Sequence, residues 1–439
     1  MVKGHFAGGI VGENNYGTIT DCTTYEQVTV KGYFAGGIVG RLYSGSITNC
    51  RSSAAVAGNR QADGTATQAG GIAGYILVSE VNQCSAPGTI TNENGSYSGG
   101  IIGLIDGATG DSSVRNCDFT GNIVVSDATD SFAGGIAGAA SGTIENCQVS
   151  GTITMQDAMN CAVGGIAGSL SAQTAGNRAL NCDADCVITI QNASFTDVGG
   201  IVGRLFSEVS NCHASGDCIV TASASHHRIG GIAGMSRGKI TCSYMTGTIE
   251  ITDNTSAATI MAGGIAGISD GKINCCYAAG ALSVPFVSPE TYIGGIVGVL
   301  LAYPSVSDES FPSHVFRSVS LLAAVDGTAG KTGRIAGSIM SDTPTADNIV
   351  SQSNYAFAGM TVNGTLPQTD GSDSMQGVSA SPADLYKINW WQNNPGWSDC
   401  WGGGNDTPWV SSGSTDYPLP VLYWETDSQD HALPPHLLP

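Results

Sequence analysis

Thiols are the most versatile chemical groups in this sequence, because a cysteine can bind a metal ion, form a disulfide or act as a nucleophile. The 439 residues include 14 cysteines. No CxxC pair is accompanied by a second CxxC or by spaced histidines, so the pattern predicts neither a metal site nor a cofactor. Eight cysteines instead share one recurring position, at Cys22, Cys50, Cys84, Cys117, Cys147, Cys182, Cys212 and Cys276.

A glycine block of the form GGI-x-G is the second candidate for chemistry, since glycine loops bring backbone N–H groups close to bound phosphates. A phosphate loop occurs once in a chain, between a strand and a helix. Here the block recurs without a helical pattern after it, and a degenerate copy, GRIAG, begins at Gly333. We therefore interpret the glycines as corners where a side chain would clash, each followed by an inward-facing isoleucine. The blocks begin at Gly8, Gly36, Gly70, Gly99, Gly134, Gly164, Gly199, Gly230, Gly263 and Gly294.

Catalytic motifs are missing from the sequence. It contains neither H-E-x-x-H, the zinc-peptidase motif, nor G-x-S-x-G, and its carboxylates are scattered among only 16 basic residues. The pair His226–His227 has no second cluster of metal ligands in the sequence, and we expect both side chains to be exposed in a loop. These observations predict a protein that is not an enzyme. A β-helix enzyme that cleaves polysaccharides is the alternative.

Short segments rich in isoleucine, valine and threonine surround the glycine blocks and the cysteines. Each repeat reads GGI-x-G, I-x-N-C and G-T-I-x-V, with Gly, Asn, Asp or Ser at the boundaries, which is typical of strands and turns. One repeat is too small to bury a core, whereas stacked repeats share one. We predict an all-β fold, a β-solenoid (β-helix) of ten to eleven coils with three short strands per repeat. The variable loops, such as 57–69, 104–113 and 252–262, should project from one edge.

In such a stack the recurring cysteines would form one column. Stacked residues about 4.8 Å apart hold parallel Cβ atoms too far apart for an unstrained disulfide, so we expect buried free thiols. The asparagine before the cysteine, as at Asn49 and Asn116, should form a ladder of amide hydrogen bonds at a corner. Cys242 and Cys275 occupy that preceding position in consecutive repeats. Any disulfide should involve these two or the cysteines without shared register, which are Cys161, Cys186, Cys218 and Cys400.

The combination of GGIxG, I-x-N-C and G-T-I over residues 4–340 resembles the GLUG-type repeat. This repeat is found in bacterial surface proteins and in the non-catalytic N-terminal part of IgA-specific metallopeptidases. The resemblance implies a secreted or surface-anchored bacterial protein, and it implies no catalytic residues because the repeats are a scaffold. The chain enters directly at a repeat motif without a signal peptide, so we expect a longer parent protein to supply the signal and anchor.

The repeat pattern stops near residue 340, which predicts two parts: solenoid repeats over 1–340 and a capping region rich in Trp, Gly and Pro over 341–439. All six tryptophans lie at or after Trp390. An open solenoid end exposes unpaired backbone groups and apolar core, so we expect the tryptophans to pack as a cap on the last coil. Exposed rings would suit sugar stacking instead, and the candidate ligand-binding aromatic residues are then Trp397, Trp401 and Trp409.

The net charge of −20 argues against binding to nucleic acid, which requires clustered Lys and Arg. No apolar run of about 18 residues is present, so no membrane span is expected. The favoured hypothesis is a monomeric, extracellular or cell-surface adhesin or stalk that binds glycans or proteins of the host or matrix. The alternatives are the carbohydrate-active enzyme, an accessory domain of a larger surface peptidase, and an ice-binding face built from the recurring Thr-Ile-Thr segments.

Overall fold

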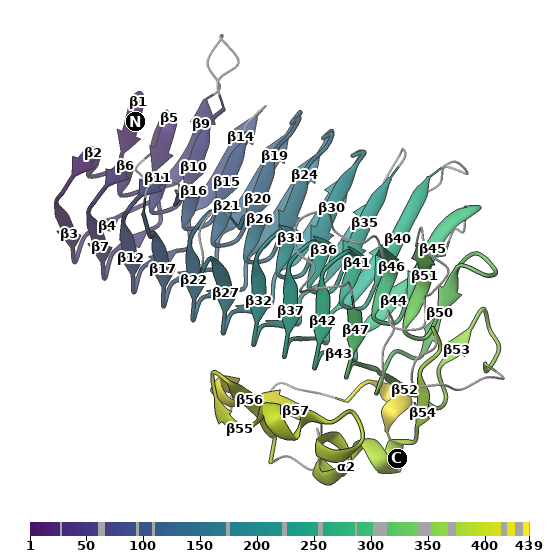
Figure 1. The fold of residues 1–439 in the computed structure, drawn as a ribbon. Helices are drawn as coiled ribbons and strands as arrows, with labels where there is room; N and C mark the ends of the chain where they lie inside the picture. Colours follow the sequence, from purple (N-terminus) through teal and green to yellow (C-terminus); the bar gives the residue numbers. More distant parts are fainter. Residues whose placement is uncertain are drawn as a thin grey trace.

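The chain winds into a long stack of coils that follow one another from the N-terminus onward (Figure 1). The computed structural model describes residues 1–26, 29–59, 66–93, 96–107, 110–172, 176–221, 226–252, 258–285, 288–301, 314–340, 353–367, 375–413, 419–425 and 433–438. Within this part of the chain, each strand of a coil pairs in parallel with the equivalent strand of its neighbours. The predicted all-β solenoid is confirmed, and its second sheet contains 11 strands, which agrees with the predicted number of coils.

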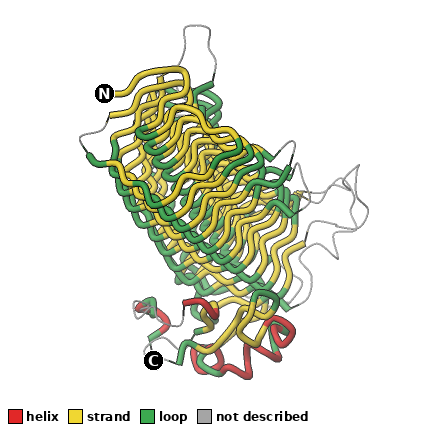
Figure 2. Tube along the Cα trace, turned by 90° about the vertical axis from the view of Figure 1, so that its left-hand side faces the viewer, coloured by secondary structure: helices red, strands yellow, loops and turns green. Residues whose placement is uncertain are grey.

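Four parallel sheets run along the stack, and the short helices lie near the C-terminus (Figure 2). The first sheet contains β1 (Val2–Gly8), β5 (Thr29–Gly36), β9 (Ala55–Asn59), β10 (Gln68–Gly70), β14 (Thr89–Glu93), β15 (Tyr97–Gly99), β19 (Asn122–Ser126), β20 (Phe132–Gly134), β24 (Thr152–Gln156), β25 (Ala162–Gly164), β29 (Val187–Gln191), β30 (Thr196–Gly199), β34 (Cys218–Thr221), β35 (His227–Gly230), β39 (Thr248–Ile251), β40 (Thr259–Gly263), β44 (Ala281–Ser283), β45 (Glu290–Gly294) and β50 (Thr332–Gly333). The second sheet contains β2 (Val11–Asn15), β6 (Val39–Tyr43), β11 (Ala73–Leu77), β16 (Ile102–Asp106), β21 (Ala137–Ala140), β26 (Ala167–Leu170), β31 (Val202–Leu205), β36 (Ala233–Ser236), β41 (Ala266–Ser269), β46 (Val297–Leu301) and β51 (Ala336–Met340).

The third and fourth sheets are built from shorter strands. The third sheet contains β3 (Thr18–Thr20), β7 (Ser46–Thr48), β12 (Glu80–Asn82), β17 (Ser113–Arg115), β22 (Thr143–Glu145), β27 (Arg178–Leu180), β32 (Glu208–Ser210), β37 (Lys239–Thr241), β42 (Lys272–Asn274) and β47 (His314–Phe316). The fourth contains β4 (Thr23–Thr24), β8 (Arg51–Ser52), β13 (Ser85–Ala86), β18 (Asp118–Phe119), β23 (Gln148–Val149), β28 (Asp183–Ala184), β33 (His213–Ala214), β38 (Tyr244–Met245), β43 (Tyr277–Ala278), β48 (Val319–Ser320), β52 (Tyr355–Phe357) and β54 (Val378–Ala380). A separate pair joins β49 (Ala324–Val325) and β53 (Thr361–Val362).

A complete coil contains five short strands rather than the three that the sequence predicted. The coil that starts at β14 passes through β14 and β15 of the first sheet, β16 of the second, β17 of the third and β18 of the fourth. The additional strands lie just before the glycine block and just after the cysteine. They have two or three residues each, which is too short for an alternating pattern to be recognised in the sequence.

The glycine blocks allow neighbouring coils to approach at a bend. A Cβ atom at Gly37 would lie 2.1 Å from the carbonyl oxygen of Gly71 in the next coil and 2.0 Å from the Ser52 hydroxyl. The isoleucine that follows, Ile38, is completely buried, as is its equivalent Ile72 one coil further on. Each block therefore places one apolar side chain in the shared core, and its glycines leave no side chain between neighbouring coils at the bend.

The variable loops leave the stack at two corners, which corrects the expectation of a single edge. The strands on either side of 57–69 and of 252–262 belong to the first sheet, whereas those beside 104–113 belong to the second and third sheets. Residues 60–65, 108–109 and 253–257 of these loops lie outside the described residues. Differences in loop length therefore fall between strands, where they leave the pairing of the coils intact.

The stack continues past residue 340, because β52 and β54 extend the fourth sheet. Its end is closed by the segment that leads into β54. The buried guanidinium of Arg334 donates hydrogen bonds to the carbonyl oxygens of Gln376 and Gly377, and the Ile335 N–H donates to that of Met375. Backbone groups that an open end would expose are thereby paired.

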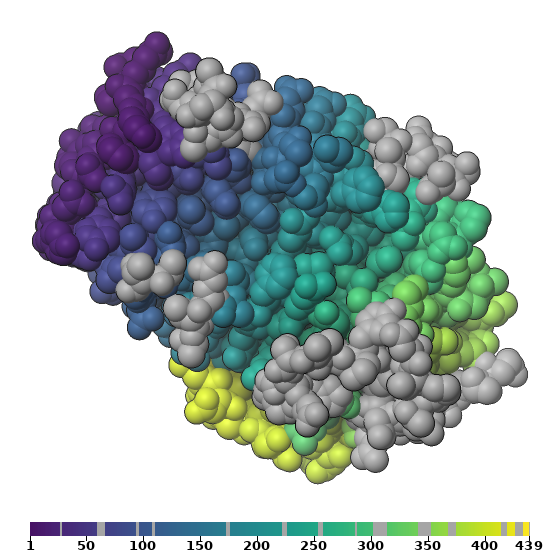
Figure 3. Space-filling view, turned by 45° about the horizontal axis from the view of Figure 1, so that its top comes forward, coloured from purple at the N-terminus to yellow at the C-terminus, as the bar shows by residue number. Residues whose placement is uncertain are grey.

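We call residues 381–438 the tail; the space-filling view shows it along one side of the coils (Figure 3). This position corrects the expectation that the tryptophans pack on the last coil. The Trp390 ring contacts Tyr355 at the end of the stack, while the Trp424 indole donates a hydrogen bond to the Asn211 carbonyl several coils earlier. The tail contains α1 (Pro382–Leu385), α2 (Ile388–Asn393), the 3-10 helices η2 (Trp397–Cys400), η3 (Tyr423–Glu425) and η4 (Pro435–Leu437), and the antiparallel strands β55 (Trp401–Gly404), β56 (Thr407–Ser411) and β57 (Pro420–Leu422).

Candidate functional site

The recurring cysteines form a column at the corner between the third and fourth sheets. All 14 cysteines lie among the described residues, and each is a free thiol. The Cys84 N–H donates to Cys117 Sγ at 3.4 Å, and Cys84 Sγ lies 3.3 Å from the Asn82 carbonyl oxygen. Burial raises the pKa of the Cys276 thiol to about 12, and burial also raises the pKa of the Cys147 thiol well above its ordinary value. Cys276 and Cys147 are therefore neutral packing groups at neutral pH.

The residue before each column cysteine forms a second column, on the outside of the same corner. Its backbone is left-handed, with φ of 53° at Asn146 and 54° at Asn211, a conformation that asparagine adopts more readily than most residues. The Asn181 amide donates to Asn146 at 3.1 Å, and that of Asn211 donates to Asn181 at 3.2 Å. We call this row the corner ladder. Its later positions hold Cys242, Cys275 and Arg317, with φ values of 46°, 54° and 50°.

The tail binds along the corner ladder, one position after another. The Asn405 side-chain oxygen accepts a hydrogen bond from Asn181 at 3.0 Å, and its carbonyl oxygen accepts one from Asn211 at 2.9 Å. Next along the ladder, Cys400 Sγ lies 3.1 Å from Cys275 Sγ. Asp399 then accepts two hydrogen bonds from Arg317, at 2.9 and 2.8 Å. The tail thus places an amide opposite the asparagines of the ladder, a thiol opposite its cysteine and a carboxylate opposite its arginine.

A buried ionic cluster joins the tail to the outer face of the fourth sheet. His213 Nδ1 lies 3.2 Å from Asp183 and 3.0 Å from Glu425 of the tail. Burial lowers the pKa of His213, but the charges of Glu425 and Asp183 outweigh burial and raise it to about 9. Glu425 also accepts hydrogen bonds from the Tyr244 hydroxyl at 2.9 Å and from the Leu422 N–H at 2.7 Å. This cluster is an attachment point in which a positive imidazolium is shared by two carboxylates.

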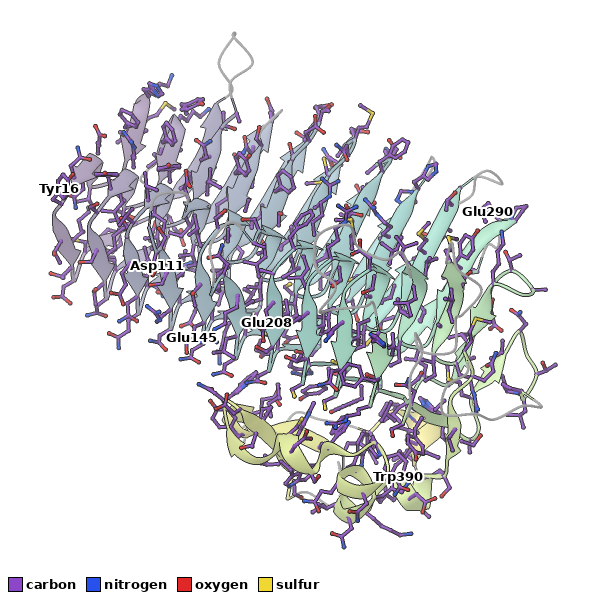
Figure 4. The ribbon with its side chains drawn as sticks, viewed as in Figure 1. Tyr16, Asp111, Glu145, Glu208, Glu290 and Trp390 are labelled. Carbon is purple, nitrogen blue, oxygen red and sulfur yellow. The ribbon has the colours of Figure 1, made fainter. Side chains whose placement is uncertain are left out.

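The tryptophans proposed as ligand-binding residues lie mostly inside the molecule. Trp397 and Trp409 are 0% exposed, and their ring centroids are 4.8 Å apart. Trp409 also packs on Tyr277 of β43, at 5.6 Å. Trp401 is half-buried. Figure 4 shows Trp390 within the tail, below the edge of the coils that carries Glu145. These rings form a small core between the tail and the fourth sheet, and Trp397 and Trp409 leave no face for a sugar.

A different aromatic row lies on the outside of the coils, where the first sheet bends into the second. The parallel register aligns the residues two positions before each glycine block. The residues that come directly after each GGI-x-G block form a facing row. We call the two rows together the outer seam. The first row is Phe6, Phe34, Gln68, Tyr97, Phe132, Ala162, Asp197, Arg228, Met261 and Tyr292. The second row is Glu13, Arg41, Tyr75, Leu104, Ala139, Ser169, Arg204, Met235, Ile268 and Val299.

The N-terminal half of the outer seam is aromatic and half-buried. The rings of Phe6 and Phe34 stack at 5.3 Å, and Phe34 meets Tyr75 edge to face at 5.4 Å. The Arg41 guanidinium lies 5.7 Å from the ring centroids of both Phe6 and Tyr75. Further along, Tyr97 stacks on Phe132 at 5.7 Å. Sequence reasoning missed this row, although the aromatic residue before A-G-G or S-G-G recurs at four blocks and was a usable signal.

The middle of the outer seam is charged. The fully buried Asp197 forms ion pairs with Arg204 and Arg228, and Arg204 also lies 5.5 Å from the Phe132 ring centroid. His226 is exposed, as expected. The neighbouring His227 is instead fully buried, with Nδ1 2.7 Å from the Thr196 hydroxyl, which corrects the expectation for this residue. Its position in β35 explains the burial, because alternate strand residues point inward.

At its C-terminal end the outer seam becomes apolar. Tyr292, Ile268 and Val299 are buried together, with Met235 and Met261 packed against them. The seam therefore changes from aromatic to ionic to aliphatic along the stack, and its half-exposed rings lie in the aromatic part. Among the described residues, no helix has the length and apolar character needed to cross a membrane.

Comparison with known families matches two parts of this stack. The model described as "The GLUG motif" matches residues 33–57 and 196–221. Each match covers a strand that enters the glycine block, the bend, the cysteine corner and the strand after it, so the two lie at equivalent places in the coil. Neither curated proteins nor solved structures gave a match. Two repeats of the chain thus match the GLUG motif, and the stack of coils that contains them is a β-solenoid.

Proposed function

We propose that this solenoid is a non-enzymatic binding module, secreted or displayed on a bacterial cell surface, that recognises glycans of a host or matrix. The aromatic part of the outer seam is the binding surface. Its half-buried rings at Phe34, Tyr97 and Phe132 are held in register by the coils, so little side-chain entropy is lost on binding. Sugars stack on such rings through their C–H faces, and the Arg41 guanidinium beside them can donate to hydroxyl or carboxylate groups.

The observation that carries this proposal is the alignment of the rings in one row, where Phe6 stacks on Phe34 and Tyr97 on Phe132, with Gln68 between the two pairs. Parallel strands repeat at about 4.8 Å, so a row of rings along the stack forms a linear platform for an extended polymer. The net charge of −20 favours a neutral or Arg41-directed ligand over a polyanion. The chain would act as a monomer, because the platform lies on the side of a single stack.

A glycan array and a panel of mucosal matrix proteins test the proposal. We expect the native chain to bind a defined set of glycans, and we expect Phe34→Ala, Tyr97→Ala and Phe132→Ala each to weaken binding by about 1–3 kcal/mol. Tyr16→Ala is the matched control, because this ring is 75% exposed but lies outside the outer seam. An array with no bound glycan, or equal binding by the seam variants and the control, would contradict the proposal.

A further inference from the structure

Three thiols from distant parts of the chain meet where the tail crosses the corner ladder. Cys242 and Cys275 lie on neighbouring coils, joined by a hydrogen bond from the Cys242 N–H to the Asn274 carbonyl oxygen at 3.0 Å. Cys400 comes from η2 of the tail, and its Sγ atom is 3.1 Å from Cys275 Sγ. The three sulfur atoms all lie within 4.8 Å of one another, and all three residues are buried.

The fold explains why these thiols converge. Column cysteines such as Cys276 point into the core, whereas the left-handed backbone of the preceding residue turns its side chain outward. At two successive ladder positions the usual asparagine is replaced by cysteine, and the tail places its one cysteine over them. Two thiols from the stack and one from the tail therefore face a common point.

We propose that Cys242, Cys275 and Cys400 bind one thiophilic divalent metal ion of the Zn²⁺ type, which fastens the tail to the stack. Zinc–thiolate bonds of about 2.3 Å place tetrahedral sulfur ligands about 3.8 Å apart. The separations here, from 3.1 Å for one pair to no more than 4.8 Å for any pair, bracket that value. Soft thiolates are the ligands that select zinc and similar ions.

The charge around the thiols suits a bound cation. Each S–H bond is replaced by an S–metal bond, so binding releases the thiol protons and transfers no electrons. Three thiolates and a divalent ion carry one net negative charge, and the adjacent Arg317 and Asp399 form an ion pair with no net charge. Asp399 Oδ1 lies 3.6 Å from Cys400 Sγ and adds a carboxylate to the surroundings of the three thiols.

Three converging thiols favour a metal over a disulfide. A disulfide between Cys275 and Cys400 would fasten the tail by itself and leave Cys242 without a role. A metal ion uses all three thiols and links two coils as well as the tail. The inference is independent of the proposed glycan binding, because the cluster lies on the corner ladder and the rings lie on the outer seam.

Titration of the full chain with Zn²⁺ tests the site. The protein is first reduced and stripped with a chelator, and binding is followed by calorimetry and, with Cd²⁺, by sulfur-to-metal charge-transfer absorption. We expect one ion per chain, with binding at least about tenfold weaker in Cys275→Ser and in Cys400→Ser. The control is Cys182→Ser, which removes a buried column thiol away from the cluster. Zn²⁺ should also slow proteolytic release of the tail in the native chain but not in Cys400→Ser.

Several results would overturn the proposal. One is a folded, reduced chain that takes up neither Zn²⁺ nor Cd²⁺. Another is metal binding that is unchanged by Cys400→Ser, with the fold verified by circular dichroism. A third is a cross-linked peptide pair containing Cys275 and Cys400 in air-exposed protein, followed by no metal uptake after reduction; that outcome would replace the metal site with a covalent latch.

Discussion

The Nδ1 atom of His213 lies 3.0 Å from a carboxylate oxygen of Glu425, and this pair joins the fourth sheet to the far end of the tail. The His213 and Glu425 side chains are 5% and 3% exposed. Asp183, Thr246 and Tyr244 complete the surroundings of the two groups. Because the pair is buried, its strength depends on whether the imidazole carries a proton.

Alkaline pH should therefore weaken the attachment of the tail. Folding raises the pKa of His213 from 6.5 to about 9, so its contribution is complete below pH 6.5 and is lost as the pH rises through 9. The loss amounts to about 3 kcal/mol. Limited proteolysis of the tail between pH 6 and pH 10 measures this effect. In His213→Gln the rate of cleavage should no longer rise over that range. A rise with pH as large as that of the native protein would contradict the assignment.

Replacing Glu425 by Gln should loosen the tail at neutral pH. The change removes the charge that faces a buried imidazolium, and the loss of one partner of a buried pair costs about 3–5 kcal/mol. The loss of stability can be measured by chemical denaturation with tryptophan fluorescence as the signal, because the tail contains all six tryptophans. Glu250→Gln is the matched control at an exposed carboxylate, and it should leave the transition unchanged.

Adding a methyl group inside the bend should destabilise the stack. A Cβ atom at Gly100 would lie 2.1 Å from the Gly135 carbonyl oxygen and 2.3 Å from the Phe119 ring. We expect Gly100→Ala to lower the free energy of unfolding by about 3 kcal/mol or to prevent folding. Gly4→Ala, where the nearest atom is 3.5 Å away, should change it by less than about 0.5 kcal/mol. Equal melting temperatures for the two variants would refute this role of the glycine blocks.

The thiol column should accept serine but not a larger side chain. Cys147 Sγ lies 3.3 Å from the Glu145 carbonyl oxygen, and Ser243 makes the equivalent bond to Thr241 at 2.8 Å in a later coil. Cys147→Ser should therefore cost less than about 1.5 kcal/mol. Cys147→Leu overpacks the corner and should cost about 1–3 kcal/mol. A larger loss for serine than for leucine, measured by urea denaturation, would be inconsistent with a hydrogen-bonded column.

A thiol count checks the state of the cysteines. Unreduced protein, denatured with guanidinium, should show 14 reactive thiols, whereas the native protein should react slowly because 13 of the cysteines are buried. Cys22 is half-buried at the first coil and should react first. A denatured count that rises after reduction would reveal disulfides.

The coil could be predicted from the sequence because its determinants are local and repeated. Gly37 and Ile38 have equivalents in every block, so the period, the bend and the inward residue are all visible in the printed chain. Strands β15 and β18 were missed because segments of three and two residues carry no periodicity. The outward rings of Phe34 and Tyr97 were missed although a signal was present, since an aromatic residue precedes A-G-G or S-G-G at four blocks.

The position of the tail could not be predicted, because it depends on contacts between residues far apart in the chain. The sequence shows Cys242 and Cys275 in one register and Cys400 outside it, but nothing local brings them together. One signal was available. The outward row of the fourth sheet changes from Gln148 and Asp183 to His213, Tyr244 and Tyr277, and such a change indicates that another segment covers the later coils.

Because the tail runs along the side of the stack, it divides the stack into two parts that should unfold differently. In a stack where each coil touches only its neighbours, unfolding proceeds stepwise from the ends. The tail contacts the stack from Asn181 to Tyr355. The coils between these residues are therefore held by the tail as well as by their neighbours, and they should unfold together. The coils before Asn181 hold the aromatic part of the outer seam. Under a force along the stack, unfolding would begin in the coils before Asn181 and pause where the contacts with the tail start. A tether built from this chain would therefore lengthen before the coils held by the tail unfolded.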